Sequence, residues 1–221
     1  MTSGRSLKTR LKTARGRSLS SQRWLTRQLN DPYVHRARQE GWRARSVFKL
    51  LELDERFSLL KPGARVVDLG AAPGSWSQYA ARKGCKVVAV DLLAMAPLPG
   101  VELIQGDFLD PEVQASLRER LGGPADVVLS DMAAAATGQR AVDRLRAEAL
   151  GEAVLDFAAE VLAPGGACAL KLVKGGEAAL MPPAQAWFAT AKVVRPKATR
   201  AESSEVFLVA RGFKGQPAVP G

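Results

Sequence analysis

The sequence predicts an α/β protein with a mostly parallel, doubly wound sheet of seven strands and helices on both faces. Two observations predict this class. Short runs rich in Val, Leu and Ala alternate with amphipathic helical stretches after a break at Pro62-Gly63. The first of these runs, VVDLG, leads directly into a glycine-rich turn that opens a helix. A chain of 221 residues, 47% of them hydrophobic, can fill one such core but not two large ones.

Before the break the chain is basic and then helical. Residues 1–19 are rich in Ser, Lys and Arg, and we expect a flexible basic arm there. From residue 20 to about 55, apolar side chains recur at helical spacing. We therefore expect one domain over residues 20–214, which includes this helical extension, and a flexible tail over residues 215–221.

Beyond the break, strand signals and helix signals alternate in a regular order. Each apolar run is short enough for a strand and is bounded by Gly, Pro or Asp. Pro111 starts one helix. The long amphipathic stretch over 139–162 is stopped by the Pro164-Gly165-Gly166 sequence that follows it. The expected strands are 64–70, 85–92, 101–108, 125–132, 167–173, 191–196 and 205–213. The expected helices between them are 75–83, 111–121, 139–162 and 183–190.

The formal net charge of +10 lies at the beginning of the chain. The first 45 residues hold twelve Lys and Arg against Asp31 and Glu40, and the remainder is neutral. Clustered cations bind nucleic acids because they neutralise phosphates and release counterions. Trp24, Tyr33 and Trp42 lie among these arginines, which disfavours a merely solubilising tail or a transit peptide. Further cations that we expect on an RNA-binding surface are Arg43, Arg45, Arg195, Lys197 and Arg200.

The cysteines and the histidine exclude several classes of protein. Cys85 and Cys168 lie in expected strands without CxxC spacing, and His35 is the only histidine. We therefore expect no structural metal site and no disulfide, but two apolar core cysteines in a reducing cytoplasm. No apolar run reaches the roughly 18 residues that a membrane span needs, so we expect no membrane partner.

The turn after the first strand reads Gly70-Ala-Ala-Pro73-Gly74, and it predicts which ligand the sheet binds. In such sheets ligands bind beyond the carboxyl ends of the strands. A dinucleotide fingerprint would read GxGxxG, whereas Pro73 stiffens this turn and removes a donor to a pyrophosphate. Asp68 just before the turn suits a ligand with an ammonium and a sulfonium better than one with two phosphates. S-adenosylmethionine is therefore favoured over NAD.

Two more carboxylates fall at the ends of expected strands. Asp91 ends the second strand, where it can accept from both hydroxyls of a ribose, and Asp107 ends the third, within reach of an adenine amino group. Each could instead be an ordinary cap or turn residue. Three carboxylates at successive strand ends, with Asp68 the first, favour the binding role.

Several motifs, in this order, resemble those of the bacterial FtsJ/RrmJ-type 23S rRNA uridine 2′-O-methyltransferases. They are VVDLGAAPGSWSQYA, VDLLAM, GVELIQGDF, SDMA, LAPGG, LKLVKG and SSEVFLVA. The resemblance runs from about Trp24 to Gly212. It implies a Rossmann-like methyltransferase fold with an antiparallel last strand, S-adenosylmethionine as the methyl donor, and 23S rRNA of the large ribosomal subunit as the partner. The residues expected to bind the cofactor are Gly74, Trp76, Asp91, Asp107 and Asp131, together with Asp68 and Gly70 of the turn.

The residues also indicate which acceptor atom is methylated. The loop after the fourth strand reads Ser-Asp131-Met-Ala rather than the Asn/Asp-Pro-Pro-aromatic sequence of amino N-methylation. Methylation at base C5 needs a cysteine nucleophile, and both cysteines are expected in the core. A ribose hydroxyl needs a base, and Lys171 interrupts an apolar strand, where a lysine is costly unless it has a partner or lies at an exposed strand end. Lys174 is the other candidate for this base, but its side chain points to the other face of the sheet if the strand continues to that residue.

The resemblance supplies a catalytic set of four residues. The family's Lys-Asp-Lys-Glu tetrad corresponds to Lys49, Asp131, Lys171 and Glu205. We expect Lys171 to act as the general base, Asp131 to orient its ammonium, and Lys49 and Glu205 to position the ribose.

The chain departs from the family pattern at three places, and alternatives stay open. Ser75 replaces a second glycine, Ala134 to Ala136 replace Pro-Asn after the fourth strand, and Gly175 to Glu177 are altered. The tetrad could act on tRNA or another RNA, and the chain could be a non-enzymatic ribosome-assembly factor, although the intact tetrad disfavours this. A NAD-dependent dehydrogenase is a distant third. We expect a cytoplasmic monomer.

Overall fold

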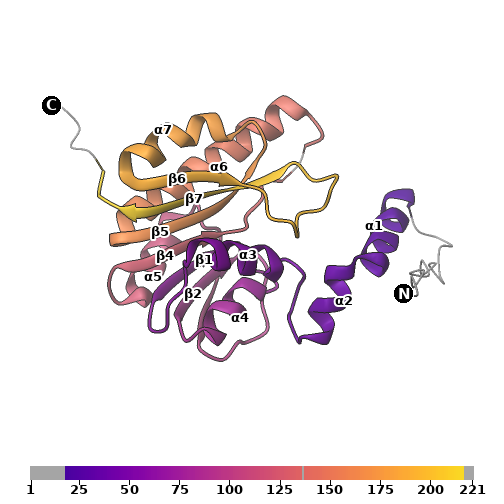
Figure 1. The fold of residues 1–221 in the computed structure, drawn as a ribbon, viewed down its shortest axis with the longest axis horizontal. Helices are drawn as coiled ribbons and strands as arrows, with labels where there is room; N and C mark the ends of the chain where they lie inside the picture. Colours follow the sequence, from indigo (N-terminus) through magenta and orange to yellow (C-terminus); the bar gives the residue numbers. More distant parts are fainter. Residues whose placement is uncertain (1–17, 136, 217–221) are drawn as a thin grey trace, which may run out of the picture.

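A computed structural model describes residues 18–135 and 137–216. Its centre is a seven-stranded sheet in the order β3-β2-β1-β4-β5-β7-β6 (Figure 1). Neighbouring strands are parallel, except that β7 runs antiparallel to both β5 and β6. The strands are β1 Arg65–Leu69, β2 Lys86–Asp91, β3 Val101–Gln105, β4 Ala125–Ser130, β5 Leu162–Val173, β6 Phe188–Val194 and β7 Glu205–Phe213. The predicted mostly parallel sheet with an antiparallel last strand is confirmed.

Helices cover both faces of the sheet (Figure 1). They are α1 Leu19–Asn30, α2 Pro32–Gln39, α3 Val47–Phe57, α4 Ser75–Arg82, α5 Pro111–Leu121, α6 Arg140–Val161 and α7 Glu177–Trp187. The core on one face is shared with α5, α6 and α7, and the core on the other face with α3 and α4. Helices α1 and α2 extend away from the sheet (Figure 1). No helix of the described residues is both long and apolar enough to cross a membrane.

The two cores follow from the alternation of side chains along each strand. Val66 packs under α3 and α4, whereas Val67 packs under the opposite helices. Leu170 and Leu172 of β5 likewise face α6, which leaves Lys171 between them on the α3 side. This alternation decides where the lysine goes.

The predicted elements are confirmed in kind, but several boundaries differ, most of all around α7 and at the start of β5. The helix expected at 183–190 is α7, Glu177–Trp187, and the next strand begins at Phe188 instead of 191. Pro182 and Pro183 lie inside this helix, and burial of its Leu180 and Ala184 in the core stabilises the earlier start. Strand β5 begins at Leu162, with a register irregularity opposite β4 before Ala167.

The two expected flexible ends fall largely outside the described part of the chain. The arm over 1–19 lies outside it up to residue 17, and the tail over 215–221 lies outside it from residue 217. The domain boundaries given above therefore stay predictions.

Candidate active site at the carboxyl edge of the sheet

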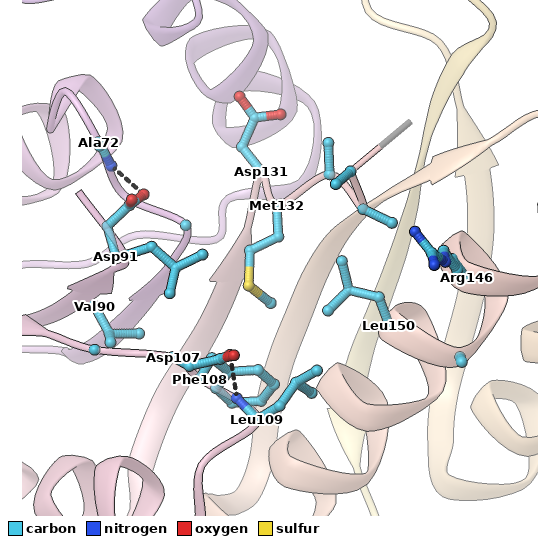
Figure 2. A pocket seen from close by; sticks show the side chains of 17 residues that line it. Ala72, Val90, Asp91, Asp107, Phe108, Leu109, Asp131, Met132, Arg146 and Leu150 are labelled. Carbon is cyan, nitrogen blue, oxygen red and sulfur yellow. Dashed lines mark hydrogen bonds between the residues drawn. The ribbon is translucent and has the colours of Figure 1, made fainter. Parts of the chain in front are cut away.

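A cleft of about 730 Å³ opens where the parallel strands end (Figure 2). Its floor comes from four successive strand ends: Gly70 follows β1, Asp91 ends β2, Asp107 follows β3 and Asp131 follows β4. Helix α6 supplies one wall through Leu150 and other side chains. The carboxylates therefore gather at one edge, as the parallel strands predict.

Backbone groups fix the orientation of two of these carboxylates. Asp91 Oδ2 accepts from the backbone N–H of Ala72 at 2.8 Å, and its Oδ1 accepts from that of Leu93 at 2.8 Å. Asp107 Oδ1 accepts from the N–H of Leu109 at 2.9 Å. Both carboxylates are therefore held at the cleft as fixed hydrogen-bond acceptors (Figure 2).

Gly70 lets the loop after β4 approach the turn closely. Its φ is +71°, and a Cβ at this position would lie 2.4 Å from Cγ of Met132. Met132 thereby projects into the middle of the cleft (Figure 2). A side chain larger than hydrogen at position 70 would displace the methionine.

Three of the expected cofactor residues do not line this cleft in the described structure. Asp68 is buried toward α4, where its Oδ2 accepts from Ser77 Oγ at 2.5 Å. Burial raises the pKa of Asp68 to about 7. Gly74 is the N-cap of α4, with a φ of +99°, and Trp76 is buried, with its Nε1 donating to Ser46 O at 2.8 Å. These three residues lie in or against the turn but do not line the cleft, and their direct contact with a cofactor stays a prediction.

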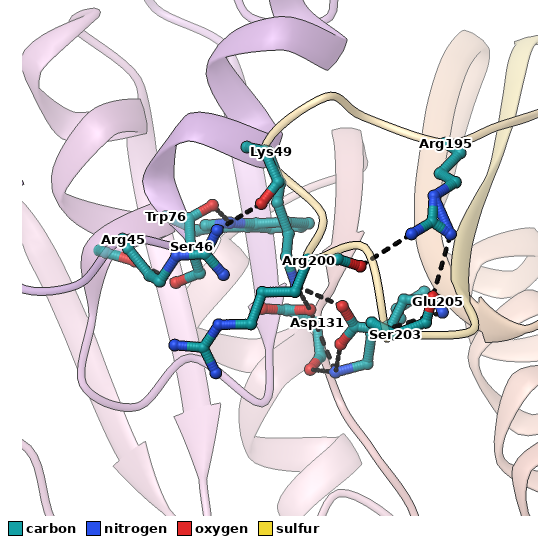
Figure 3. A network of polar contacts seen from close by, with 12 residues as sticks. Arg45, Ser46, Lys49, Trp76, Asp131, Arg195, Arg200, Ser203 and Glu205 are labelled. Atoms are coloured by element: carbon teal, nitrogen blue, oxygen red, sulfur yellow. Dashed lines mark hydrogen bonds and ion pairs between the residues drawn. The ribbon is translucent and has the colours of Figure 1, made fainter. Parts of the chain in front are cut away.

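The four tetrad residues meet beside the cleft. Figure 3 labels three of them, Lys49, Asp131 and Glu205. Lys171 Nζ lies 3.1 Å from Asp131 Oδ1 and 3.9 Å from Glu205 Oε1, and it also donates to the backbone carbonyl of Asp131. Lys49 Nζ lies 3.0 Å from Glu205 Oε2 and 3.7 Å from Asp131 Oδ1. Asp131 belongs to both the cleft and this cluster, so it joins the two halves of the site.

Secondary structure explains why the cluster forms. Lys171 points to the α3 face of β5, and α3 brings Lys49 to the same side. Strand β7 pairs with β5 so that Glu205 lies opposite Val173 and Phe207 opposite Lys171. The Lys49 and Lys171 side chains are only 7% and 11% exposed. Lys171 is therefore not a solvated residue at an exposed strand end.

The two lysines also determine the charge state of Glu205. Burial acts to raise the pKa of Glu205, but Lys49, helped by Lys171, outweighs burial, so the pKa lies below its ordinary value. Glu205 is therefore ionised at neutral pH. A negative Glu205 in turn stabilises the positive charge of Lys49.

Most of the arginines expected on an RNA surface have partners within the protein. Arg43 donates to the carbonyls of Pro73, Ala96 and Pro97, which ties the turn to the loop after β2. Arg195 donates to three carbonyls of the loop between β6 and β7. These guanidinium groups hold loops of the protein itself, and their contact with RNA stays a prediction.

Sequence reasoning missed several residues of the cleft. Leu92 follows Asp91 directly, and Phe108 and Leu109 follow Asp107, so apolar residues just after each aspartate were a usable signal. Arg146 and Leu150 reach the cleft from α6, and no local motif marks them. Cys168 is buried in the core as expected, and burial raises the pKa of its thiol to about 12, which excludes a nucleophilic role.

The fold and the site together define a methyltransferase. A doubly wound sheet carries a cleft with two aspartates and apolar side chains at its carboxyl edge, and a further aspartate that lines the cleft contacts two lysines that could serve an acceptor. Comparison with known proteins identifies the family. The model of the FtsJ-like methyltransferase family matches residues 42–213, so the chain belongs to this family.

Individual relatives agree with this assignment. A ribosomal RNA large subunit methyltransferase E from Xanthobacter autotrophicus is 53% identical over 220 residues, which cover 96% of this chain and 87% of the relative. A protein of the same name from Gluconobacter oxydans is 52% identical over 206 residues, 92% of this chain and 77% of the relative. The crystal structure of a ribosomal RNA methyltransferase from Plasmodium falciparum matches with a TM-score of 0.71 at 27% identity, over 79% of this chain and all of that one.

Proposed function

We propose that this protein transfers a methyl group from S-adenosylmethionine to the 2′-hydroxyl of a uridine in 23S rRNA, on the large ribosomal subunit in the cytoplasm. The observation that carries this proposal is the double role of Asp131, which lines the cleft and contacts Lys171 at 3.1 Å and Lys49 at 3.7 Å. A donor in the cleft and an acceptor at the lysines would therefore meet at one carboxylate. The names of the relatives from Xanthobacter and Gluconobacter support a large-subunit RNA as the substrate.

The residues of the cleft fit the adenosyl part of S-adenosylmethionine. Asp91 is held by two backbone donors and can accept from both ribose hydroxyls, while Asp107 can accept from the adenine amino group. Leu92, Leu109 and Met132 provide apolar surface for the flat base. When bound, S-adenosylmethionine would supply a methyl group on a positively charged sulfur. An oxygen nucleophile can bond to that methyl carbon in line with the sulfur, which is the leaving group.

Lys171 is the proposed general base. A neutral Nζ would take the proton of the 2′-hydroxyl, and the resulting ammonium would lie 3.1 Å from Oδ1 of Asp131. Asp131 would therefore orient the amine before the transfer and stabilise its charge afterwards. Because the acceptor oxygen must also be aligned with the methyl group, much of the rate should come from positioning.

Lys49 and Glu205 are proposed to hold the ribose. They form a close pair at 3.0 Å, so each has a fixed position at the edge of the cluster. An ammonium and a carboxylate can donate to and accept from sugar hydroxyls, respectively. Neither residue needs to exchange a proton in this scheme.

Methyl transfer to purified RNA substrates tests the proposal. The protein and labelled S-adenosylmethionine are incubated with large ribosomal subunits from a strain that lacks its own enzyme, and with tRNA in parallel. We expect the label in an alkali-resistant dinucleotide from 23S rRNA, because a methylated 2′-oxygen cannot attack the neighbouring phosphate. Label in tRNA alone would contradict the substrate, and alkali-sensitive label would contradict the ribose as the acceptor.

A further inference from the structure

A single carboxylate oxygen of Asp31 binds two arginines near the tetrad. Asp31 Oδ2 lies 3.0 Å from Nε of Arg45 and 3.1 Å from Nε of Arg200. The Asp31 side chain is only 8% exposed, and its Oδ1 caps α2 by accepting from the N–H of Tyr33 at 3.0 Å. An aspartate of the N-terminal helical extension thus joins two distant segments of the methyltransferase fold.

Both arginines belong to segments that lead into the tetrad. Arg45 lies in the turn before α3, four residues before Lys49, and its guanidinium also donates to the carbonyl of Ala198. Arg200 lies in the loop that enters β7, five residues before Glu205. Figure 3 shows the two arginines together with the Lys49 and Glu205 side chains. Two guanidinium groups therefore flank the acceptor side of the site.

The charges at this position leave a cation available to an anion. One carboxylate faces two guanidinium groups, so the three side chains together carry a net positive charge. The Arg200 side chain is 24% exposed, so an anion can reach this guanidinium group, and its buried Nη2 has no hydrogen-bond partner among the described residues. Guanidinium groups bind phosphate oxygens in a fixed planar geometry, and every ribose in RNA has a phosphate on each side.

We propose that Asp31 is a positioning residue, which holds Arg45 and Arg200 in place for the RNA phosphate beside the target ribose. This inference rests on the proposed function, because it takes RNA as the acceptor. Asp31 does not touch the reacting atoms; it acts through the two arginines. The helical extension would then contribute to RNA binding through this buried contact as well as through its surface charge.

Asp31→Asn tests the role, because asparagine keeps the helix cap and removes the charge. We expect the KM for the RNA substrate and the Kd for a 23S rRNA fragment to rise about tenfold. The kcat should stay within about twofold and the Kd for S-adenosylmethionine should not change, since the tetrad and the cleft are intact. Asp110→Asn is the matched control: Asp110 caps α5 before a proline and accepts from the N–H of Glu112 at 2.9 Å, and we expect unchanged RNA affinity.

A double-mutant cycle separates positioning from general support of the fold. Arg200→Gln removes one of the two guanidinium groups and should by itself weaken RNA binding in the same way. If Asp31 acts through this arginine, Asp31→Asn should add less than its own tenfold loss in the Arg200→Gln background. Full additivity would overturn the proposal, as would an unchanged RNA Kd in Asp31→Asn.

Failure of the proposed function gives a different result. If the wild-type protein transferred no methyl group to any RNA, the proposed reaction would be wrong, while the binding measurements would still decide the role of Asp31. If the wild-type protein methylated rRNA and Asp31→Asn did so with the same KM, only the inference about Asp31 would be overturned.

Discussion

Lys49 Nζ lies 3.0 Å from Glu205 Oε2, although the two residues are 156 positions apart in the chain. This contact joins α3 to the start of β7, where Glu205 also lies 3.9 Å from Nζ of Lys171. Both side chains are largely buried, so removal of either one leaves an uncompensated charge beside the others. The four charges of the tetrad are therefore coupled, and a single substitution changes the environment of the other three residues as well.

Lys171→Ala should abolish methyl transfer, because the 2′-hydroxyl would lose its base. A loss of at least about a hundredfold in kcat is expected, with the Kd for S-adenosylmethionine changed by only a few-fold. Single-turnover transfer and calorimetric titration of the cofactor measure the two quantities. Lys174→Ala is the control, since Lys174 is exposed and should be dispensable. Equal turnover of Lys171→Ala and the wild type would refute the assignment of the base.

Asp91→Asn should weaken cofactor binding by about 10- to 100-fold, because a charged acceptor for the ribose hydroxyls becomes a neutral one. The kcat at saturating cofactor should change little. Asp126→Asn is a suitable control, since Asp126 Oδ2 accepts from the N–H of Arg65 at the opposite edge of the sheet. An unaltered cofactor Kd in Asp91→Asn would place the ribose elsewhere.

Gly70→Ala should destabilise the turn and obstruct the cleft. The added Cβ would lie 2.4 Å from Cγ of Met132, and a φ of +71° costs a residue with a side chain about 1–2 kcal/mol. We expect weaker cofactor binding and a lower Tm in thermal unfolding. Met132→Ala in the same protein should restore part of the Tm, because it removes the clashing side chain. No recovery would show that backbone conformation alone limits this position.

The stability of the protein should depend on the protonation of Asp68. Burial raises its pKa from 3.8 to about 7, so between these values the folded protein keeps a proton that the unfolded chain releases. The free energy of unfolding therefore falls as pH rises through this window. Asp68→Asn should abolish this contribution and make the protein more stable than the wild type at pH 8, by on the order of 2–4 kcal/mol.

Urea denaturation at several pH values between 4.5 and 8 measures this difference. The two proteins should be most alike at the acidic end, where wild-type Asp68 is protonated. Parallel stability curves across the whole range would mean that Asp68 does not titrate in it.

The basic residues of the N-terminal arm should strengthen RNA binding in a salt-dependent way. Six Lys and Arg lie between Arg5 and Arg17. Replacing all six by glutamine should flatten the plot of log Kd against log salt, because fewer counterions are released on binding. Fluorescence anisotropy with a 23S rRNA fragment between about 50 and 200 mM salt measures the slope. An unaltered slope would argue that the arm does not contact the RNA.

Local patterns predicted the sheet and the cleft, because their causes are local. Runs of Val, Leu and Ala marked all seven strands, and the carboxyl ends of parallel strands must share an edge. That rule brings Asp91, Asp107 and Asp131 together without further information. The position of α7 was missed because Pro182-Pro183 is a strong local signal, and burial of Leu180 overrides it.

The tetrad and the Asp31 contact depend on long-range packing, which residue patterns do not reveal. Lys49 and Glu205 were identified only by resemblance to a family, since neither lies in a segment with a distinctive local pattern. Asp31 was counted only as one of two acidic residues in the basic N-terminal segment. Its two arginine partners lie 14 and 169 positions away, and only the folded chain brings them together.

The position of β7 between β5 and β6 has a consequence for the newly made protein. Translation produces β5 and β6 before β7, so the hydrogen-bonding edge of β5 that faces away from β4 remains unpaired until residues 205–213 have left the ribosome. Glu205 arrives with that strand, and Lys49 then gains its closest carboxylate partner. The cofactor cleft consists of earlier segments, so a nascent chain would complete its donor half before its acceptor half.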